Sequence, residues 1–348
     1  MIEANIGKYY LKYRTKERNK FNAGSKAVND CNFILEKLGY KPLYINISPS
    51  ANKLIKLINA IKLFSIMKLK KNDVIVIPHP IEIMRYYINV IHIVHKIKKI
   101  KTCYLIHDML SVRFPKDFGC EYIDHKMIKD ADFIIAHNRV MKEYIYRIDK
   151  SKKIVSLDIF DYLGKINFNK KRKSCTLNIA GNLSKEKAQY LYHMKGLNEN
   201  ISLNLYGANY NQQKNHSSQC HYFGKFPPDE VPTVFVEGFG LIWDGTSIET
   251  CSGDMGNYLR YNNPHKLSLY LSAGLPVVVW KKSAIKKFVL ENNVGIAVNS
   301  INEFYERYVT LKDDEYQEMC ENANKIAKRL HSGQYLKKAI RQMEIGLS

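Results

Sequence analysis

The sequence predicts an α/β protein of two Rossmann-like domains, and three observations support this. Its 348 residues are enough for two ordinary domains, and 45% hydrophobic with 11% aromatic residues can fill two cores. Short apolar runs alternate with helical periodicity in both halves of the chain. One stretch, NNPHKLSLYLSAGLPVVVW (residues 262–280), has the pattern of a helix, a tight turn and a buried parallel strand. Two such series imply two domains that face each other across a cleft at the strand C-termini.

The first half alternates between strands and helices. Its candidate strands are KYYLKY, KPLYINI, DVIVIPHP, TCYLIHD and DFIIAHN. Helical periodicity marks SKAVNDCNFILEKLGY, LIKLINAIKLFSIMKLK, IEIMRYYINVIHIVHKIKK, YIDHKMIKDA and RVMKEYIYRI. A lysine-rich segment, LGKINFNKKRKS, follows, and we place the domain linker inside it. The predicted N-terminal domain therefore covers residues 1–165.

A second alternating series occupies the other half. It runs through CTLNIAGN, KEKAQYLYHM, ISLNLYGAN, HYFGKF, PDEVPTVFVEG, FGLIWDG and residues 262–280, then closes with VGIAV and helices up to Ser348. We predict a C-terminal domain over residues 172–325. The last segment, residues 326–348, is expected to form a helix that packs back on the N-terminal domain.

The unit at 262–280 has clear start and stop signals. Asn263 is a good N-cap, and Pro264 suits the first helical turn, so the helix should begin at about Asn263. Gly274 is the expected left-handed stop, and a Val-rich strand follows Pro276. A helix N-terminus has free N–H donors and partial positive charge, to which Lys266 adds a full charge. This combination favours a phosphate ligand, provisionally a nucleotide diphosphate.

Charge and cysteine usage narrow the class of protein. A formal charge of +21 and a pI near 9.5 favour anionic partners such as nucleic acid, anionic lipid or sugar nucleotides, or else reflect compositional drift. The seven cysteines are scattered singly, which argues for a reducing compartment and against a zinc site. The N-terminus lacks the apolar core of a signal peptide. We therefore expect a cytoplasmic protein, with any membrane contact peripheral.

The most specific pattern is a resemblance. NNPHKLSLYLSAGLPVVVW resembles the signature of GT-B glycosyltransferases, in which a Pro-x-Lys helix start precedes a helix and AGLPVV. With FGLIWDG and NAGSKAVNDC, the chain resembles a bacterial family of two groups. One is the β-1,6-galactofuranosyltransferases of surface polysaccharide synthesis, and the other is the glucosyltransferases of serine-rich adhesins. The resemblance covers nearly the whole chain, is most specific at 239–280, and implies a GT-B fold and a UDP-sugar donor.

The resemblance also implies roles for residues of the helix start. Asn263 and Lys266 stand at the matching phosphate-binding positions. His265 either touches the donor or caps the helix. Lysine suits the role because its compact charge stabilises the leaving nucleotide as the glycosidic bond breaks.

Other donor contacts are expected where strands of the second series end. IAGNLSK and LYGAN each follow an apolar strand with glycine and amide or hydroxyl side chains. The resemblance suggests Asn182, Lys185 and Tyr206 as donor contacts, and the alternative for each is a turn residue.

Two motifs of the first half are weaker candidates. FNAGSKA places Gly24 and Ser25 at a helix N-terminus, where a ligand can approach the backbone, although the residues also suit a plain N-cap. The full GxGxxG and P-loop patterns are missing, so we reject a dinucleotide or ATP site. His107 and Asp108 follow a predicted strand, and either could remove a proton from an acceptor hydroxyl. A capping Asp beside a surface His is the alternative.

The loop after FGLIWDG is rich in small and polar residues. Its Asp244 and Asp254 are candidates for recognising the sugar or gating the cleft. The DAD sequence at 130–132 could be taken for a metal-binding DxD motif, but we interpret it as a helix end that runs into a strand. No bound metal is expected, as the resemblance to GT-B enzymes implies, and no cofactor is expected, because the UDP-sugar is a substrate.

The leading hypothesis is a GT-B hexosyltransferase that moves galactofuranose from UDP to a glycan acceptor, which we expect to be lipid-linked. A glucosyltransferase acting on an adhesin is the alternative within the family. From other classes, we considered a basic nucleic-acid-binding protein and a non-catalytic scaffold. No RNP-type strand, zinc-finger spacing or helix-turn-helix supports a nucleic-acid partner. Relatives suggest a homo-oligomer.

Overall fold

The structure is a computed structural model that describes residues 6–15, 23–47, 68–80, 84–164, 169–214 and 217–347. The chain divides into two compact units. The first unit comprises Met1–Asn19, Val28–Leu157 and Leu336–Ser348, and the second comprises Lys20–Ala27 and Asp158–Tyr335. Most of the predicted helix LIKLINAIKLFSIMKLK lies outside the described residues.

The first unit is built on a parallel sheet. Its described strands are β1 (Lys8–Thr15), β2 (Lys41–Ile47), β3 (Val74–His79), β4 (Lys101–Ile106), β5 (Phe133–Ala136) and β6 (Lys153–Ser156). These described strands form a 6-stranded sheet in the order β2-β1-β3-β4-β5-β6, and each pair is parallel. Strand β6 was not predicted, because only one of its four residues is buried and no alternation is visible.

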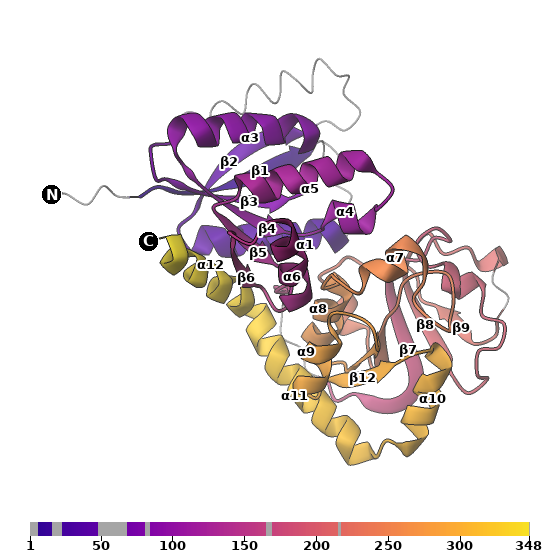
Figure 1. Ribbon diagram of the computed structural model, residues 1–348. Coiled ribbons are helices and arrows are strands. Elements are labelled where there is room, and N and C mark those ends of the chain that lie inside the picture. Colours follow the sequence, from indigo (N-terminus) through magenta and orange to yellow (C-terminus); the bar gives the residue numbers. More distant parts are fainter. Residues whose placement is uncertain are drawn as a thin grey trace. The chain divides into compact units, whose positions relative to one another are not determined.

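Helices cover both faces of this sheet. The described helices are α1 (Ala23–Lys37), α3 (Met84–Lys98), α4 (Leu110–Arg113), α5 (Phe118–Asp130), α6 (Arg139–Ile148) and α12 (Gln334–Leu347). Helices α3 and α5 lie side by side over one face (Figure 1). Helix α1 leads from β1 to β2, in the opposite direction along the sheet, and right-handed crossovers therefore put it on the other face.

The last helix joins the first unit. Glu344 of α12 accepts hydrogen bonds from Lys8 at 2.7 Å and from Tyr40 at 2.9 Å. Lys153 donates to the carbonyl of Gly346 at 2.5 Å. Helix α12 therefore packs on the first unit, which takes up the chain again at Leu336, whereas residue 326 lies inside α11 of the second unit.

The second unit repeats the architecture. Its described strands are β7 (Arg172–Asn182), β8 (Ser202–Ala208), β9 (Cys220–Tyr222), β10 (Glu237–Ile242), β11 (Val277–Trp280) and β12 (Gly295–Val298). They form a second 6-stranded parallel sheet within the described residues, in the order β12-β11-β10-β7-β8-β9. The described helices are α7 (Gly253–Tyr258), α8 (His265–Ser272), α9 (Lys286–Glu291), α10 (Ile301–Thr310) and α11 (Asp313–His331). Two parallel sheets with helices confirm the predicted fold class.

Two local predictions differ from the structure. The segment KEKAQYLYHM forms turns and a short 3-10 helix, Gln189–Tyr192, instead of an α-helix. The second unit starts at Asp158, ahead of the predicted linker in LGKINFNKKRKS, and β7 already begins at Arg172. The start of this unit is set by contacts that residues 158–163 make with distant segments, which composition alone does not show.

Candidate functional site

Lys266 lies at the carboxyl-end edge of the second sheet. It stands in the first turn of α8, and its Nζ is 3.1 Å from Oδ1 of Asp244, which follows β10. A Cβ built on Gly181, near the end of β7, would lie 3.7 Å from Lys266 Cε. The ends of β7 and β10 therefore meet at this ammonium group.

The sheet order explains why a ligand would bind at this point. Strand β7 lies between β8 and β10, so the chain leaves β7 in one direction and later fills the other side. Parallel α/β sheets bind ligands outside the strand carboxyl ends where the strand order reverses. Lys266 lies at this reversal, between β7 and β10.

Helix α8 is fixed against the sheet by Tyr270. The backbone N–H of Ala180 in β7 donates to the Tyr270 hydroxyl at 2.8 Å. The ring covers Gly240 of β10, where an added Cβ would lie 2.1 Å from the ring. Glycine is therefore required at 240 for α8 to approach, and this approach positions Lys266.

The helix start differs from the predicted one. Pro264 is the N-cap without a side-chain capping bond, and α8 begins at His265. The buried Asn263 instead donates from its side chain to the backbone carbonyl of Asp158 at 2.5 Å. Asn263 therefore ties the α8 start to the segment that opens the second unit, and its predicted capping role is wrong. The predicted stop is confirmed, because Gly274 has a φ of 68° directly after the C-cap Ala273.

His265 is held as a neutral ring. It stacks on Tyr162 with 5.1 Å between ring centroids. Burial first, and then the charge of Lys26, lower the pKa of His265 to about 4. Its Nε2 is shielded from solvent and has no hydrogen-bond partner among the described residues. His265 is thus neither a helix cap through its side chain nor a cation at neutral pH.

The other predicted donor contacts differ in how exposed they are. Asn182 is exposed at the end of β7, and its Oδ1 accepts from the Ser184 N–H at 3.0 Å and from Asn209 at 3.1 Å. Lys185 is exposed nearby in the chain. Tyr206 is 5% exposed and packs in an aromatic cluster, stacked on Phe223 at 5.0 Å. Tyr206 is therefore a core residue with almost no surface to offer a donor.

The polar loop supplies one of its two acidic candidates. Asp244 is the partner of Lys266, with 13% of its side chain exposed. Asp254 is exposed in the first turn of α7, a helix that was not predicted within this loop. Among the described residues, Lys266 forms its ion pair with Asp244 and none with Asp254.

The first unit has polar side chains at the ends of three adjacent strands. His79 ends β3, His107 and Asp108 follow β4, and His137 follows β5. Arg113 of α4 forms an ion pair with Asp108. The predicted pair therefore stands at the expected strand end, but Asp108 already has a cationic partner.

Two of these histidines have structural contacts. His79 is fully buried, and its Nε2 lies 2.7 Å from Oδ1 of Asp124. His137 lies 3.0 Å through Nε2 from the Ile106 carbonyl, and burial lowers its pKa to about 4. Both histidines therefore brace the strand ends beside Asp108.

Gly24 and Ser25 lie in the first turn of α1, and their side chains are outside the described part of the structure.

Within the described residues, no three His, Cys, Asp or Glu side chains gather as a metal site would require. In the same part of the chain, no helix combines the length and apolar character needed to cross a bilayer. The DAD sequence is confirmed as a helix end, since α5 stops at Asp130 and β5 starts at Phe133.

Sequence reasoning missed three side chains beside these candidates. Arg113 follows Asp108 by five residues, on the first helical turn after the strand, and that spacing was a usable signal. Tyr190 has a buried hydroxyl with no partner among the described residues, and the negative charge of Asp244 helps to raise its pKa, after burial. Arg260 lies over the Trp280 ring at 4.6 Å. No local pattern marks either of these two.

The architecture matches solved glycosyltransferases. Sucrose-phosphate synthase from Thermosynechococcus elongatus has a TM-score of 0.68 at 10% identity, over 98% of this chain and 99% of that chain. Anabaena HepE in complex with UDP has a TM-score of 0.63 at 14% identity, over 96% of this chain and 99% of that chain. The fold is therefore GT-B.

The sequence relatives identify the family. Glucosyltransferase 3-like domain models match residues 8–159 and 177–343. The β-1,6-galactofuranosyltransferase WbbI of Escherichia coli K12 is 30% identical over 338 residues, 91% of this chain and 97% of that protein. Glucosyltransferase 3 of Streptococcus gordonii is 24% identical over 249 residues, 70% of this chain and 71% of that protein. The chain belongs to the glucosyltransferase 3-like family and is a glycosyltransferase.

Proposed function

We propose that the chain transfers galactofuranose from UDP-galactofuranose to a glycan acceptor in surface polysaccharide synthesis. The name and the coverage of WbbI support this donor. HepE, which shares the fold, has been solved with UDP and with UDP-glucose. Transfer of glucose is the second candidate, because the Streptococcus gordonii relative is a glucosyltransferase. The proposal includes a lipid-linked acceptor and self-association of the chain.

The position of Lys266 is the observation that supports a UDP donor. Its ammonium stands at the strand-order reversal of the second sheet, in the first turn of an eight-residue helix. There it would pair with the diphosphate, together with the N–H donors of α8. Negative charge grows on the leaving phosphate as the glycosidic bond breaks, so the same contact stabilises the transition state.

Asp244 must respond when the donor binds. Its Oδ1 lies 3.1 Å from Lys266 Nζ. A diphosphate that takes over the ammonium leaves the carboxylate near the sugar end of the same donor. We therefore assign Asp244 to the hydroxyl groups of the sugar.

Asp108 is the proposed base on the acceptor side. An inverting displacement needs a group that takes the proton of the acceptor hydroxyl as the oxygen attacks the anomeric carbon. The ion pair with Arg113 orients one carboxylate oxygen of Asp108 and leaves the other for the hydroxyl. His79 and His137 act only by supporting the strand ends next to it.

The central experiment is Lys266→Ala. Loss of a charge-assisted contact should weaken UDP binding by roughly ten- to a hundred-fold, measured by calorimetry. Turnover should fall further than binding, because the contact strengthens in the transition state. The exposed Lys328 of α11 provides a matched control, and Lys328→Ala should bind UDP like the parent. Unchanged UDP affinity in Lys266→Ala, with a large fall in melting temperature, would show that Lys266 is structural.

The donor sugar is tested on the parent protein. Thermal shift with UDP-galactofuranose, UDP-glucose, UDP-galactose and UDP, followed by product analysis, should favour UDP-galactofuranose. Activity should persist in EDTA, because Lys266 and the α8 N-terminus supply the positive charge at the diphosphate. Activity that disappears in EDTA and returns with magnesium or manganese contradicts this part of the proposal.

A further inference from the structure

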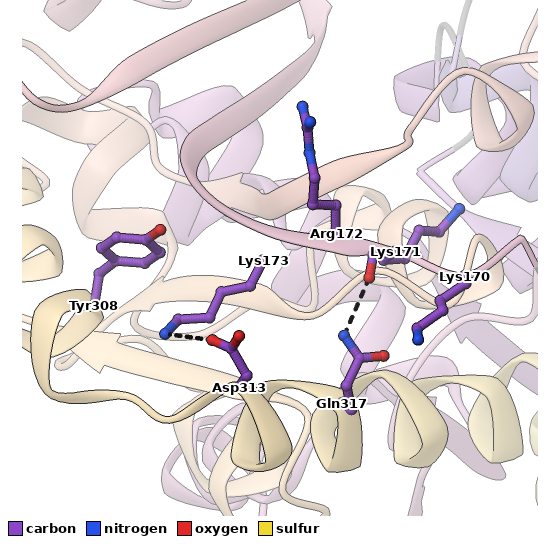
Figure 2. A pocket seen from close by; sticks show the side chains of 7 residues that line it. All are labelled: Lys170, Lys171, Arg172, Lys173, Tyr308, Asp313 and Gln317. Atoms are coloured by element: carbon purple, nitrogen blue, oxygen red, sulfur yellow. Dashed lines mark hydrogen bonds and ion pairs between the residues drawn. The ribbon is translucent and has the colours of Figure 1, made fainter.

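A basic pocket lies at the amino end of β7, in the second unit. It has a volume of about 550 Å³ and is lined by Lys170, Lys171, Arg172, Lys173, Tyr308, Asp313 and Gln317. Figure 2 shows the start of β7 on one side and α11 on the other, with Lys170 and Lys173 turned towards α11. We call these seven residues the basic pocket.

The basic pocket is separate from the donor position. Strand β7 runs for 11 residues from Arg172 to Asn182, and Lys266 stands next to Gly181 at its other end. At about 3.3 Å per residue, the two ends of the strand are roughly 30 Å apart. A molecule in the basic pocket is therefore not the UDP-sugar donor.

Three of the four cations in the basic pocket are anchored. Lys173 donates to Asp313 at 3.0 Å and to the Leu311 carbonyl at 2.5 Å, and it lies 5.3 Å from the centre of the Tyr308 ring (Figure 2). Arg172 pairs with Glu237. The buried Lys171 donates to the Phe235 carbonyl at 2.6 Å. These contacts give three of the four positive charges fixed partners.

The remaining groups are available to a ligand. No hydrogen bond or ion pair of the Lys170 ammonium is found within the described residues. The Tyr308 hydroxyl stays protonated, since burial raises its pKa, and it can therefore donate. Basic groups outnumber carboxylates in the lining, even when Glu237 is included. A phosphate group, with several acceptor oxygens and negative charge, fits this set.

Two exposed aliphatic side chains lie next to residues that line the basic pocket. Val236 is 57% exposed, and its carbonyl accepts from the Arg172 N–H at 3.1 Å. Val309 is also 57% exposed and directly follows Tyr308 in the chain. Single exposed aliphatic residues are ordinary on a protein surface. Beside a phosphate-sized basic pocket, they can enter the boundary between headgroups and acyl chains.

We propose that the basic pocket binds the phosphate of an anionic membrane lipid, with Val236 and Val309 entering the headgroup layer. Lys170 contacts the phosphate oxygens, and the anchored cations add long-range attraction. The second unit is thereby held at the membrane surface by the amino end of its sheet. This proposal does not depend on which sugar the chain transfers.

The test is co-sedimentation with vesicles of phosphatidylcholine containing a minority of phosphatidylglycerol, against vesicles of phosphatidylcholine alone. The parent should bind only the first. One basic residue near a membrane surface is worth about five-fold in binding, so Lys170→Glu should weaken binding by roughly twenty-five-fold. Lys328→Glu, the same charge change on α11, should have little effect. Melting temperature and UDP affinity should match the parent in both variants.

A third variant separates the lipid from a soluble phosphate. Val309→Ser should weaken vesicle binding and leave binding of inorganic phosphate unchanged. If Lys170→Glu and Lys328→Glu weaken vesicle binding equally, general surface charge explains the binding and the proposal is overturned. Phosphate binding that depends on Lys170, with no vesicle binding, would also overturn it in favour of a soluble ligand. If Lys170→Glu lowers the melting temperature, Lys170→Ala gives the same comparison without a reversed charge.

Discussion

Because Lys266 and Asp244 form an ion pair, replacing one or the other should change UDP affinity in opposite directions. Both side chains are partly buried, at 21% and 13% exposure. Asp244→Asn removes the charge that competes with the diphosphate for Lys266. UDP should therefore bind more tightly by about five-fold, as expected for loss of a weak ion pair, and calorimetry measures this directly.

Comparing the binding of UDP with that of the whole UDP-sugar tests whether Asp244 also contacts the sugar. If the carboxylate contacts sugar hydroxyl groups, the same Asp244→Asn variant should gain affinity for UDP but not for the UDP-sugar. A variant that binds UDP more weakly than the parent would show that Asp244 instead holds Lys266 in its binding position.

His265 gives the second unit a stability that depends on pH. Its pKa falls from 6.5 to about 4 on folding, so between these values the unfolded chain binds more protons than the folded one. The contribution of a neutral His265 is therefore complete above pH 6.5 and is lost as the pH falls towards 4. His265→Phe keeps an aromatic ring against Tyr162 and removes the titration. Its melting temperature should fall less steeply over this pH range than that of the parent, and equal slopes would contradict the assignment.

At the scale of elements, the contact of α8 with the sheet depends on Gly240. A methyl group there would overlap the Tyr270 ring, and overpacking of this kind costs about 1–3 kcal/mol. Gly240→Ala should lower the melting temperature and also weaken UDP binding, because α8 positions Lys266. Gly224→Ala is the matched control, since Gly224 has a φ of 88° but no neighbour that an added Cβ would meet. If the control loses as much UDP affinity, general destabilisation of the second unit rather than the position of α8 explains the effect.

Elements with local signals were predictable from sequence. The stop at Gly274 and the strand β11 follow from turn chemistry and a run of valines within a few residues. The start of helix α8 was not predictable in this way, because the Asn263 side chain bonds to a carbonyl 105 residues away instead of capping the helix. Tyr206 was misjudged for a similar reason, since the aromatic rings around it come from separate segments.

The candidate site was predictable in part. Lys266 and Asp244 were both named from motifs, yet their contact crosses 22 residues of sequence and only the structure joins them. Asp108 was found from its place after an apolar strand, whereas its partner Arg113, five residues further along the chain, was overlooked although that spacing was a usable signal. Side-chain types at strand ends are local information, whereas their partners depend on how the strands are ordered.

At the scale of the whole molecule, the chain leaves the first unit at Leu157 and returns to it at Leu336. The return segment has fully buried apolar side chains, namely Leu336, Ala339, Ile340 and Met343. An amphipathic pattern shows that such a helix is buried, but it does not show against which unit. The sequence pattern therefore does not show that the chain returns to the first unit at Leu336.

Removal of residues 336–348 therefore tests the division into units. Each large apolar side chain buried by α12 is worth about 1.5–3 kcal/mol, so deletion should strongly destabilise the first unit. Hydrogen exchange, followed by mass spectrometry, should rise in β1 and β5, because Glu344 bonds to Lys8 and Gly346 packs on Phe133. Exchange in β7, β10 and β11 should stay close to that of the full chain. The truncated protein should also still bind UDP, because Lys266, Asp244 and Gly181 all belong to the second unit. Increased exchange in both sheets together would mean that the two units fold as one.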